Sequence, residues 1–372
     1  MIPLIRADIL PLRKILLIAL CALLCSFAVL ARAQEKNEFS AELEEANLSV
    51  YRDAQKAVAL SSYVYQHAKN IDTKIFALVT MVNGYTALQQ NGKALKYASE
   101  TWKLAQRSQN IQYRIWALGL LGEQYQLSHL NGISREYLDK AENLIQHSDL
   151  SKEAQAVSSG NIYAIKGNGY KDEIDCGYAV KIYDMAIASY QSVPDNSVAR
   201  NNLALVFLEK GNCLLDLDNL KQAEGNFQKA YQLATQHGLE EYRHNAGIGL
   251  AKIAWKKGNF RTSTDSLERI LSVIDTAQNP KIKTEIYYLL KENYLALNLP
   301  EQYRIYEQKH SRAASDVEKL GNAQFENVLH FVSTQPLPVE NSTQTSSYLF
   351  YGLLLTTTVI LGREFYHSKN KR

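Results

Sequence analysis

Few groups of residues in this sequence have the types and spacing that catalysis or metal binding would need. Asp216, Asp218 and Asn219 begin like a calcium-binding loop. Lys221 stands where such a loop needs glycine, and Phe227 stands where it needs glutamate. We therefore interpret this stretch as a polar turn.

Other chemistry-bearing residues are equally isolated. The Lys166-Gly-Asn-Gly169 segment is glycine-rich, but no strand precedes it, as a phosphate-binding loop would require. His237 and His244 flank Gly238, and we interpret both as solvated. The sequence contains no HExxH, P-loop or GxSxG motif. We expect no enzymatic activity, no cofactor and no metal site.

One set of polar residues recurs at a single position of a repeated pattern. Three of its members directly follow a glycine, and that glycine lies 12 residues before the next segment of small and aromatic residues. We predict that the set forms a row along one wall and binds a protein or peptide partner; the alternative is a solvated helix face. The set is Glu123, Asn168, Asn212 and Lys252.

Those segments are triples of a small, an aromatic and a small residue with spacings of four and three, which places all three on one helix face. They recur at steps of 36 to 45 residues, with leucine replacing the aromatic in the third and sixth triples and a large residue, Ile270, ending the sixth. This pattern predicts an all-α chain of six or seven stacked helix pairs. The triples are Ser61-Tyr65-Ala68, Ala98-Trp102-Ala105, Ser134-Leu138-Ala141, Ala179-Tyr183-Ala186, Ala223-Phe227-Ala230 and Ser263-Leu267-Ile270.

The repeated unit resembles the tetratricopeptide repeat (TPR). The match is best in residues 204–237, where Phe207 and Gly211 precede the fifth triple, although Lys210 and Leu214 depart from the pattern. The resemblance implies a superhelical solenoid whose leading helices line a concave groove for peptides or proteins. It does not imply the carboxylate clamp of chaperone-binding relatives, since Ala164 stands where a lysine would be needed.

The repeat domain is expected over residues 40–332. A seventh pair, 287–297 with 301–318, keeps helical periodicity but loses the small residues, so it is either a packed repeat or a cap. Residues 333–346 are rich in Ser, Thr, Gln and Pro and are expected to form a linker.

The amino terminus has the features of a secretory signal peptide, expected over residues 1–33. Arg6, Arg13 and Lys14 precede an apolar run of about 16 residues that ends before Ala31-Arg32-Ala33. The alternative is an uncleaved membrane anchor, but the run is shorter than the ~20 residues that span a bilayer comfortably.

The carboxyl terminus has an uncharged segment, residues 347–362, followed by the basic tail 363–372. We expect a transmembrane helix with tyrosines at its interfaces and the tail inside the cell. The alternative is a buried terminal helix. With a cleaved signal peptide, this arrangement predicts an inner-membrane protein with a periplasmic repeat domain and a short cytoplasmic tail.

The amino-acid composition and the net charge fit this arrangement. Of the 372 residues, 46% are hydrophobic and 21% are charged, as in an ordinary folded protein. The basic ends more than account for the net charge of +3, so the mildly acidic body argues against nucleic-acid binding. Cys176 and Cys213 are the only cysteines after the predicted signal, and we expect two unpaired core residues, with a disulfide as the alternative.

Two classes of function follow. The first is a membrane-anchored TPR scaffold that binds a periplasmic protein or peptide through the concave groove. The second is a sensory ectodomain, since the order of segments resembles the extracytoplasmic part of bacterial TPR histidine kinases and helix-turn-helix regulators. The sequence ends ten residues after Gly362, so we expect the output domain to be lost or supplied by another chain.

Overall fold

The computed structural model describes residues 39–50, 53–274 and 280–334. Every regular element within these ranges is an α-helix, and they contain no strand. None of the described helices is long and apolar enough to cross a membrane. The segments predicted as signal peptide, membrane helix and basic tail lie outside the described residues.

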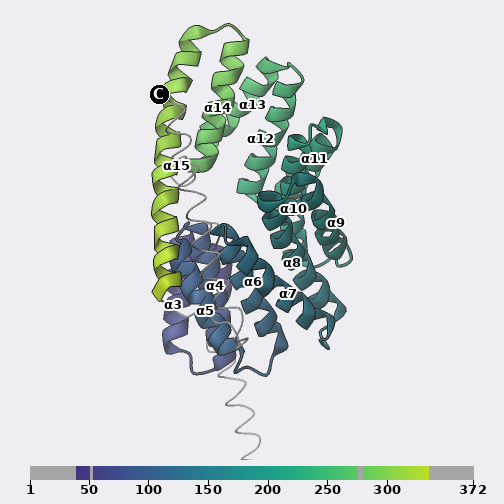
Figure 1. The fold of residues 1–372 in the computed structure, drawn as a ribbon, viewed down its shortest axis with the longest axis vertical. Helices are drawn as coiled ribbons and strands as arrows, with labels where there is room; N and C mark the ends of the chain where they lie inside the picture. Colours follow the sequence, from purple (N-terminus) through teal and green to yellow (C-terminus); the bar gives the residue numbers. More distant parts are fainter. Residues whose placement is uncertain (1–38, 51–52, 275–279, 335–372) are drawn as a thin grey trace, which may run out of the picture. The chain divides into compact units, whose positions relative to one another are not determined.

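The described helices follow one another as seven consecutive pairs (Figure 1). The described residues up to Val328 form one compact unit, which contains all of these helices except the last six residues of α15. The helices are α2 Ser40–Ser49, α3 Ala54–His67, α4 Ile71–Ala87, α5 Asn91–Ala105, α6 Ile111–Leu127, α7 Asn131–Gln146, α8 Lys152–Glu173, α9 Cys176–Gln191, α10 Ser197–Asp216, α11 Leu220–Gln236, α12 Glu240–Lys256, α13 Phe260–Val273, α14 Pro280–Ala296 and α15 Pro300–Thr334.

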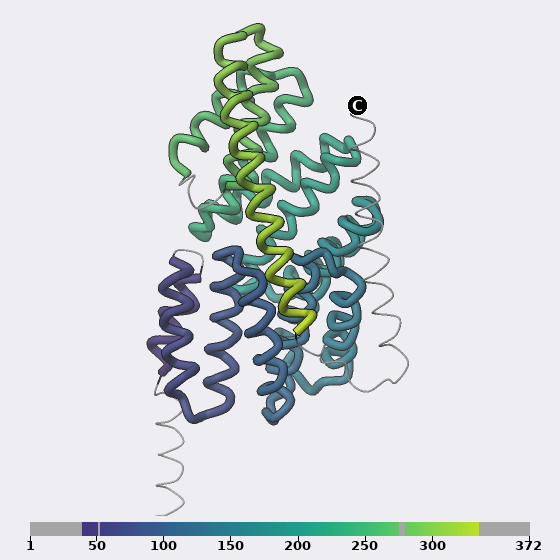
Figure 2. Tube along the Cα trace, turned by 60° about the vertical axis from the view of Figure 1, so that its left-hand side comes forward, coloured from purple at the N-terminus to yellow at the C-terminus, as the bar shows by residue number. Residues whose placement is uncertain are grey.

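The even-numbered helices form a layer of their own. Each helix from α2 to α13 packs against the next helix in the sequence, and the tube in Figure 2 shows the successive hairpins lying side by side. Each even-numbered helix from α2 to α12 also contacts the even-numbered helix two places later. The even-numbered helices therefore form a continuous wall, and the odd-numbered helix of each pair packs on it.

One type of turn closes most of the pairs. In five pairs a residue in the left-handed conformation follows the even-numbered helix, and the backbone amide of the residue directly after it donates a hydrogen bond back to a carbonyl of the helix, as in the Schellman motif. Gly258 supplies this residue in one pair, and non-glycine residues supply it in four. The recurrence of one turn confirms a repeated unit. The four non-glycine residues are Gln89, His129, Asp218 and Asn298.

The predicted triples lie in the core, although Tyr65, Trp102 and Ile270 are only partly buried. Ala179, Tyr183 and Ala186 are fully buried, as are the corresponding residues of the fifth triple. In the third triple Ser134 replaces alanine and donates its hydroxyl hydrogen to the Gly122 carbonyl at 2.7 Å. The buried hydroxyl is therefore satisfied and does not weaken the packing.

The glycines that lie 12 residues before the third, fourth and fifth triples make close contacts with those triples. A Cβ atom added at Gly122, Gly167 or Gly211 would lie nearer than 3.0 Å to the central side chain of the triple that follows. Phe227 is packed between Gly211 of its own pair and Gly249 of the next. The glycines are therefore required because an aromatic ring occupies the space of their missing side chain.

Two predicted boundaries, the end of the seventh pair at residue 318 and the start of the linker at residue 333, differ from the structure. The seventh pair is longer than predicted, since α15 has 35 residues and runs two residues into the predicted linker. Residues 335–346 lie outside the described residues. The pair is a packed one, because Tyr303 and Tyr306 of α15 pack against the apolar cluster of α14.

The expectation of two unpaired cysteines is wrong. Cys176 is the first residue of α9 and Cys213 lies in the last turns of α10, and their Cα atoms are 4.9 Å apart in a disulfide. The two helices run antiparallel, which brings the start of one beside the end of the other. The bridge therefore fastens one helix pair to the next.

The interpretation of His244 as solvated is wrong as well. It lies inside α12 with its side chain only 14% exposed, and its Nε2 is 3.8 Å from Glu240. Burial and the neighbouring Arg243 lower its pKa. Gly238 does form the predicted turn, with φ of +66°.

The other two polar segments are structural. Lys166 lies inside α8, where it forms ion pairs with Asp139 and Glu142 of α7. Asn219 caps α11 by accepting a hydrogen bond from the Gln222 backbone amide at 3.3 Å. The stretch from Asp216 to Asn219 is therefore the polar turn that the sequence indicates.

Candidate functional site: the even-helix face

The predicted polar residues lie on four successive even-numbered helices. Glu123 is on α6, Asn168 on α8, Asn212 on α10 and Lys252 on α12, and all four are partly buried. We define the even-helix face as these four residues together with Asn161 of α8, Lys171 of α8, Asn202 of α10 and Glu209 of α10.

The structure assigns two of the predicted residues to internal contacts. The Tyr183 hydroxyl donates to Asn168 Oδ1 at 2.6 Å, so this asparagine oxygen already serves a buried tyrosine. Lys252 forms an ion pair with Glu285 of α14. Both contacts hold neighbouring helices together, which the sequence prediction did not foresee.

The other two residues have no such contacts. Within the described residues neither Glu123 nor Asn212 has a hydrogen-bond or ion-pair partner. Burial alone raises the pKa of the Glu123 carboxyl to about 7. The structure does not bring the four predicted residues into contact with one another, and each belongs to a different helix of the wall.

A hydrogen-bond network centred on Asn161 was not among the sequence predictions. Asn161 Oδ1 accepts hydrogen bonds from the Tyr190 hydroxyl at 2.6 Å and from Asn202 Nδ2 at 2.8 Å. The network joins α8, α9 and α10. One signal was available, because Asn161 lies seven residues before Asn168 and therefore shares its helix face.

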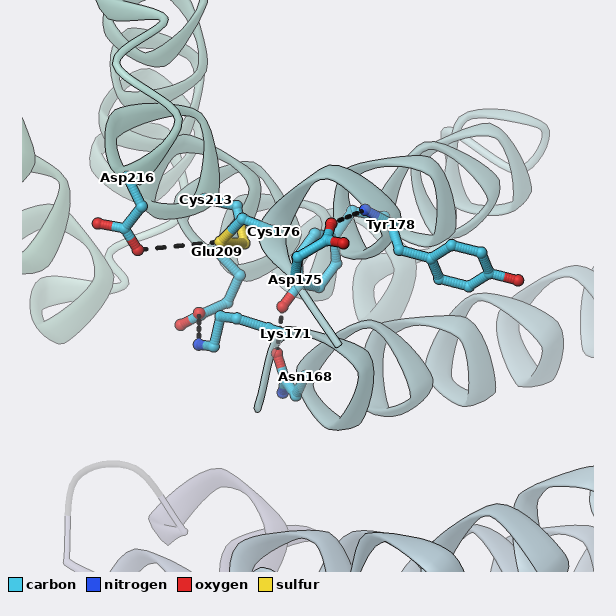
Figure 3. Close-up of a disulfide and its surroundings, with 9 residues drawn as sticks. Asn168, Lys171, Asp175, Cys176, Tyr178, Glu209, Cys213 and Asp216 are labelled. Carbon is cyan, nitrogen blue, oxygen red and sulfur yellow. Dashed lines mark hydrogen bonds and ion pairs between the residues drawn. A yellow bond between two sulfur atoms is a disulfide. The ribbon is translucent and has the colours of Figure 1, made fainter. Parts of the chain in front are cut away.

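An ion pair between α8 and α10 lies beside the disulfide (Figure 3). Lys171 Nζ is 2.9 Å from Glu209 Oε2, and Cys213 lies one turn beyond Glu209 on α10. Burial lowers the pKa of Lys171, but Glu209 with Asp172 and Asp216 outweighs burial and raises it. Lys171 is therefore charged and paired at neutral pH.

These contacts join successive even-numbered helices by side-chain bonds. Gln112 Nε2 donates to Ser158 Oγ at 3.0 Å between α6 and α8, and Gln126 Nε2 donates to Asp172 Oδ2 at 3.1 Å. The wall is therefore held in one arrangement while Glu123 and Asn212 keep free hydrogen-bonding groups. Amide and carboxyl groups of this kind bind peptide groups and cations. The described residues contain no group of three potential metal ligands.

Comparisons with known proteins identify the fold. No protein-family model matches the chain, and no curated protein matches it. Among solved structures, NprR in complex with its cognate peptide NprX is similar, with 14% identity, 93% of this chain and 99% of that chain covered, and a TM-score of 0.53. The apo form of RapI has 14% identity and a TM-score of 0.52, covering 76% of this chain and 99% of that chain.

A third similar structure comes from Pyrococcus horikoshii. It is the signal transduction ATPase PH0952, a protein with a tetratricopeptide repeat sensor. It has 14% identity and a TM-score of 0.55, and the match covers 86% of this chain and 47% of that chain. At these identities the likeness concerns the fold alone. The chain has a TPR-like helical-repeat fold, as the resemblance of its repeats implies.

Proposed function

We propose that the protein is a membrane-anchored TPR scaffold that binds a protein or peptide partner on its even-helix face, outside the cytoplasm. The observation that carries the proposal is the pair of polar side chains, Glu123 and Asn212, that form no hydrogen bond or ion pair within the described residues, although Asn161, Asn202, Lys171 and Glu209 on the same face bond between helices. Polar groups without internal partners at a fixed place in a rigid wall are suited to recognition. The complex of NprR with its peptide supports this use of the fold.

The disulfide supports the extracytoplasmic location. Disulfides persist in oxidising compartments and are rare in the reducing cytosol. The bond between Cys176 and Cys213 thus agrees with the signal peptide predicted for residues 1–33. The proposed anchor is the uncharged segment 347–362, and the proposed role is not enzymatic.

A second candidate is a sensory ectodomain whose output belongs to another chain. The likeness to a signal transduction ATPase with a tetratricopeptide repeat sensor favours it. In both candidates the even-helix face binds the ligand. In the first candidate partner binding is itself the function. In the second, binding must be transmitted as a signal through the membrane segment.

The face is tested by substitution. Asn212→Ala removes a side chain without a structural partner, whereas Asn168→Ala would also leave the Tyr183 hydroxyl unsatisfied. Gln228→Ala, on an exposed position of α11, is the matched control. Affinity-tagged variants are expressed in cells and captured from the isolated membranes, and the partner that is captured with them is quantified by mass spectrometry. We expect Asn212→Ala to reduce capture at least several-fold and Gln228→Ala to leave it unchanged; equal capture by both would contradict the proposal.

A further inference from the structure

The last helix, α15, is packed against the rest of the repeat array at two separate places. Near its start, Tyr303 and Tyr306 pack against the apolar cluster of α14. Within the described part of α15 the buried residues are Ala313 and Val328, and no residue between them is buried. About four helical turns separate these two residues. Val328, which is only 1% exposed, therefore belongs to a second contact.

The second contact is with the second helix pair. A Cβ atom built at Gly92, the second residue of α5, would lie 3.2 Å from Asn327 Cβ and 3.3 Å from the Asn327 carbonyl oxygen. Both residues belong to the same compact unit. Figure 1 and Figure 2 both show the end of α15 beside the first helix pairs. The α15 backbone approaches this closely because Gly92 has no side chain.

Gly132 shows that this close approach is not a general feature of the repeat. It is the second residue of α7 and follows an asparagine, as Gly92 does in α5. Nothing lies within 4 Å of a Cβ atom built at Gly132. The contact with α15 therefore distinguishes the second pair from the third, and Gly132 provides a matched control position.

The contact between α15 and the second pair contains no polar bond. Within the described residues no hydrogen bond or ion pair joins α15 to α4 or α5. Three side-chain amide atoms on these segments are buried and have no hydrogen-bond partner in the described part of the chain: Gln89 Oε1, Gln90 Oε1 and Gln324 Nε2. Gln324 lies three residues before Asn327 and therefore shares its helix face. Buried polar groups without partners weaken a contact.

Contacts between other helices that are not sequence neighbours have side-chain bonds. Lys171 and Glu209 form an ion pair at 2.9 Å between α8 and α10, and Asn202 Nδ2 donates to Asn161 Oδ1 at 2.8 Å between the same helices. The end of α15 has one buried apolar side chain and no such bond. Segments with few buried apolar contacts open at a lower free-energy cost than the core.

We propose that residues 324–328 of α15 form a releasable latch, which closes on the start of α5 and opens while the repeats stay folded. Each repeat of a solenoid contacts only its neighbours, so a contact between the second and seventh pairs restrains the four pairs between them. Those four pairs carry Glu123, Asn168, Asn212 and Lys252. A closed latch therefore fixes the arrangement of the even-helix face, and an open latch leaves it free to change. The latch does not rest on the proposed function.

Cysteine crosslinking in the full-length chain tests the closed state. The Cβ separation of 3.2 Å is close to the range of about 3.5–4.5 Å found in disulfides. The Gly92→Cys, Asn327→Cys double variant should therefore form a bridge under a mild oxidant. Mass spectrometry of the linked peptides measures the rate, and we expect it to be at least tenfold higher than in the Gly132→Cys, Asn327→Cys control. Equal rates in the two double variants would overturn the latch.

Thiol labelling under native conditions tests the release of the latch. Val328→Cys and Ala313→Cys place a thiol at the two buried positions of α15, and circular dichroism checks that each variant is folded. We expect Val328→Cys to be labelled at least tenfold faster than Ala313→Cys, with little dependence on dilute urea, because opening of the latch exposes little surface. Labelling of Ala313→Cys requires unfolding and should accelerate steeply with urea. Equal rates and equal urea dependence in the two variants would overturn the proposal, even if the crosslink forms.

Discussion

At the scale of single residues, the fold depends on where side chains are missing as much as on where they are present. Tyr183 and Phe227 are fully buried because glycines of the even-numbered helices leave room for their rings. The polar residues divide in the same way into those that hold the wall together and those that remain free. The spacing of residues in the sequence identifies the glycines and aromatic residues that pack together. It does not show which polar residues hold the wall together and which remain free.

Replacing Gly167 with alanine should destabilise the protein. The new Cβ atom would lie nearer than 3.0 Å to the Tyr183 ring, which is buried and has no room to move. Overpacking of this kind costs roughly 1–3 kcal/mol. Gly225→Ala on α11 is the control, since nothing lies within 4 Å of its added Cβ and alanine favours the helix by about 1 kcal/mol. In urea unfolding, Gly167→Ala should be less stable than wild type and Gly225→Ala should be more stable.

The Glu123→Gln variant should be more stable than wild type only at high pH. The folded-state pKa of about 7 lies above the ordinary value of 4.5, so the folded chain holds this proton more tightly than the unfolded chain. The resulting stabilisation is fully present below about pH 4.5 and is lost as pH rises through about 7. At pH 8 glutamine avoids a penalty of up to roughly 3 kcal/mol, at about 1.4 kcal/mol per pKa unit. Urea unfolding at pH 4.5 and pH 8 measures the difference in unfolding free energy between the variant and wild type. An equal difference at both pH values would contradict the raised pKa of Glu123.

At the scale of helices, the sequence predicts pairing well and connections between pairs poorly. The triples and the 12-residue offset identify six pairs because each small residue is required by local helix contact. The hydrogen bond between Asn161 and Asn202 joins residues 41 positions apart, so no local pattern encodes it. The disulfide was mispredicted for the same reason, because it depends on which ends of two helices meet.

Removing the disulfide should weaken the junction between α9 and α10. The bridge closes a loop of 37 residues, for which the chain-entropy estimate is about 4 kcal/mol. The Cys176→Ser, Cys213→Ala double variant should therefore unfold at lower urea concentration, and dithiothreitol should shift wild type towards the variant. If a thiol-labelling reagent changes the mass of the protein only after reduction, the bridge is confirmed. Labelling of two free thiols in the oxidised native protein would disprove it.

At the scale of the whole molecule, the repeats and the predicted anchor have separate roles in the proposed scaffold. The proposed recognition groups lie on the even-helix face, far along the sequence from residues 347–362. Replacing residues 347–372 with an unrelated membrane anchor should therefore preserve partner capture. Loss of function in a protein that still reaches the membrane and captures its partner would favour the sensory candidate.

The central claim is that the even-helix face binds the partner, and site-specific photocrosslinking tests it most directly. A benzoylphenylalanine residue is placed at Ile165 of α8, which shares a helix face with Asn161 and Asn168, or, as the control, at Gln228 of α11 in the full-length chain. Both positions tolerate a larger side chain because they are at least partly exposed. We predict a single strong crosslinked product from position 165 and little or none from position 228. Equal crosslinking from both positions, or crosslinking from position 228 alone, would contradict the account.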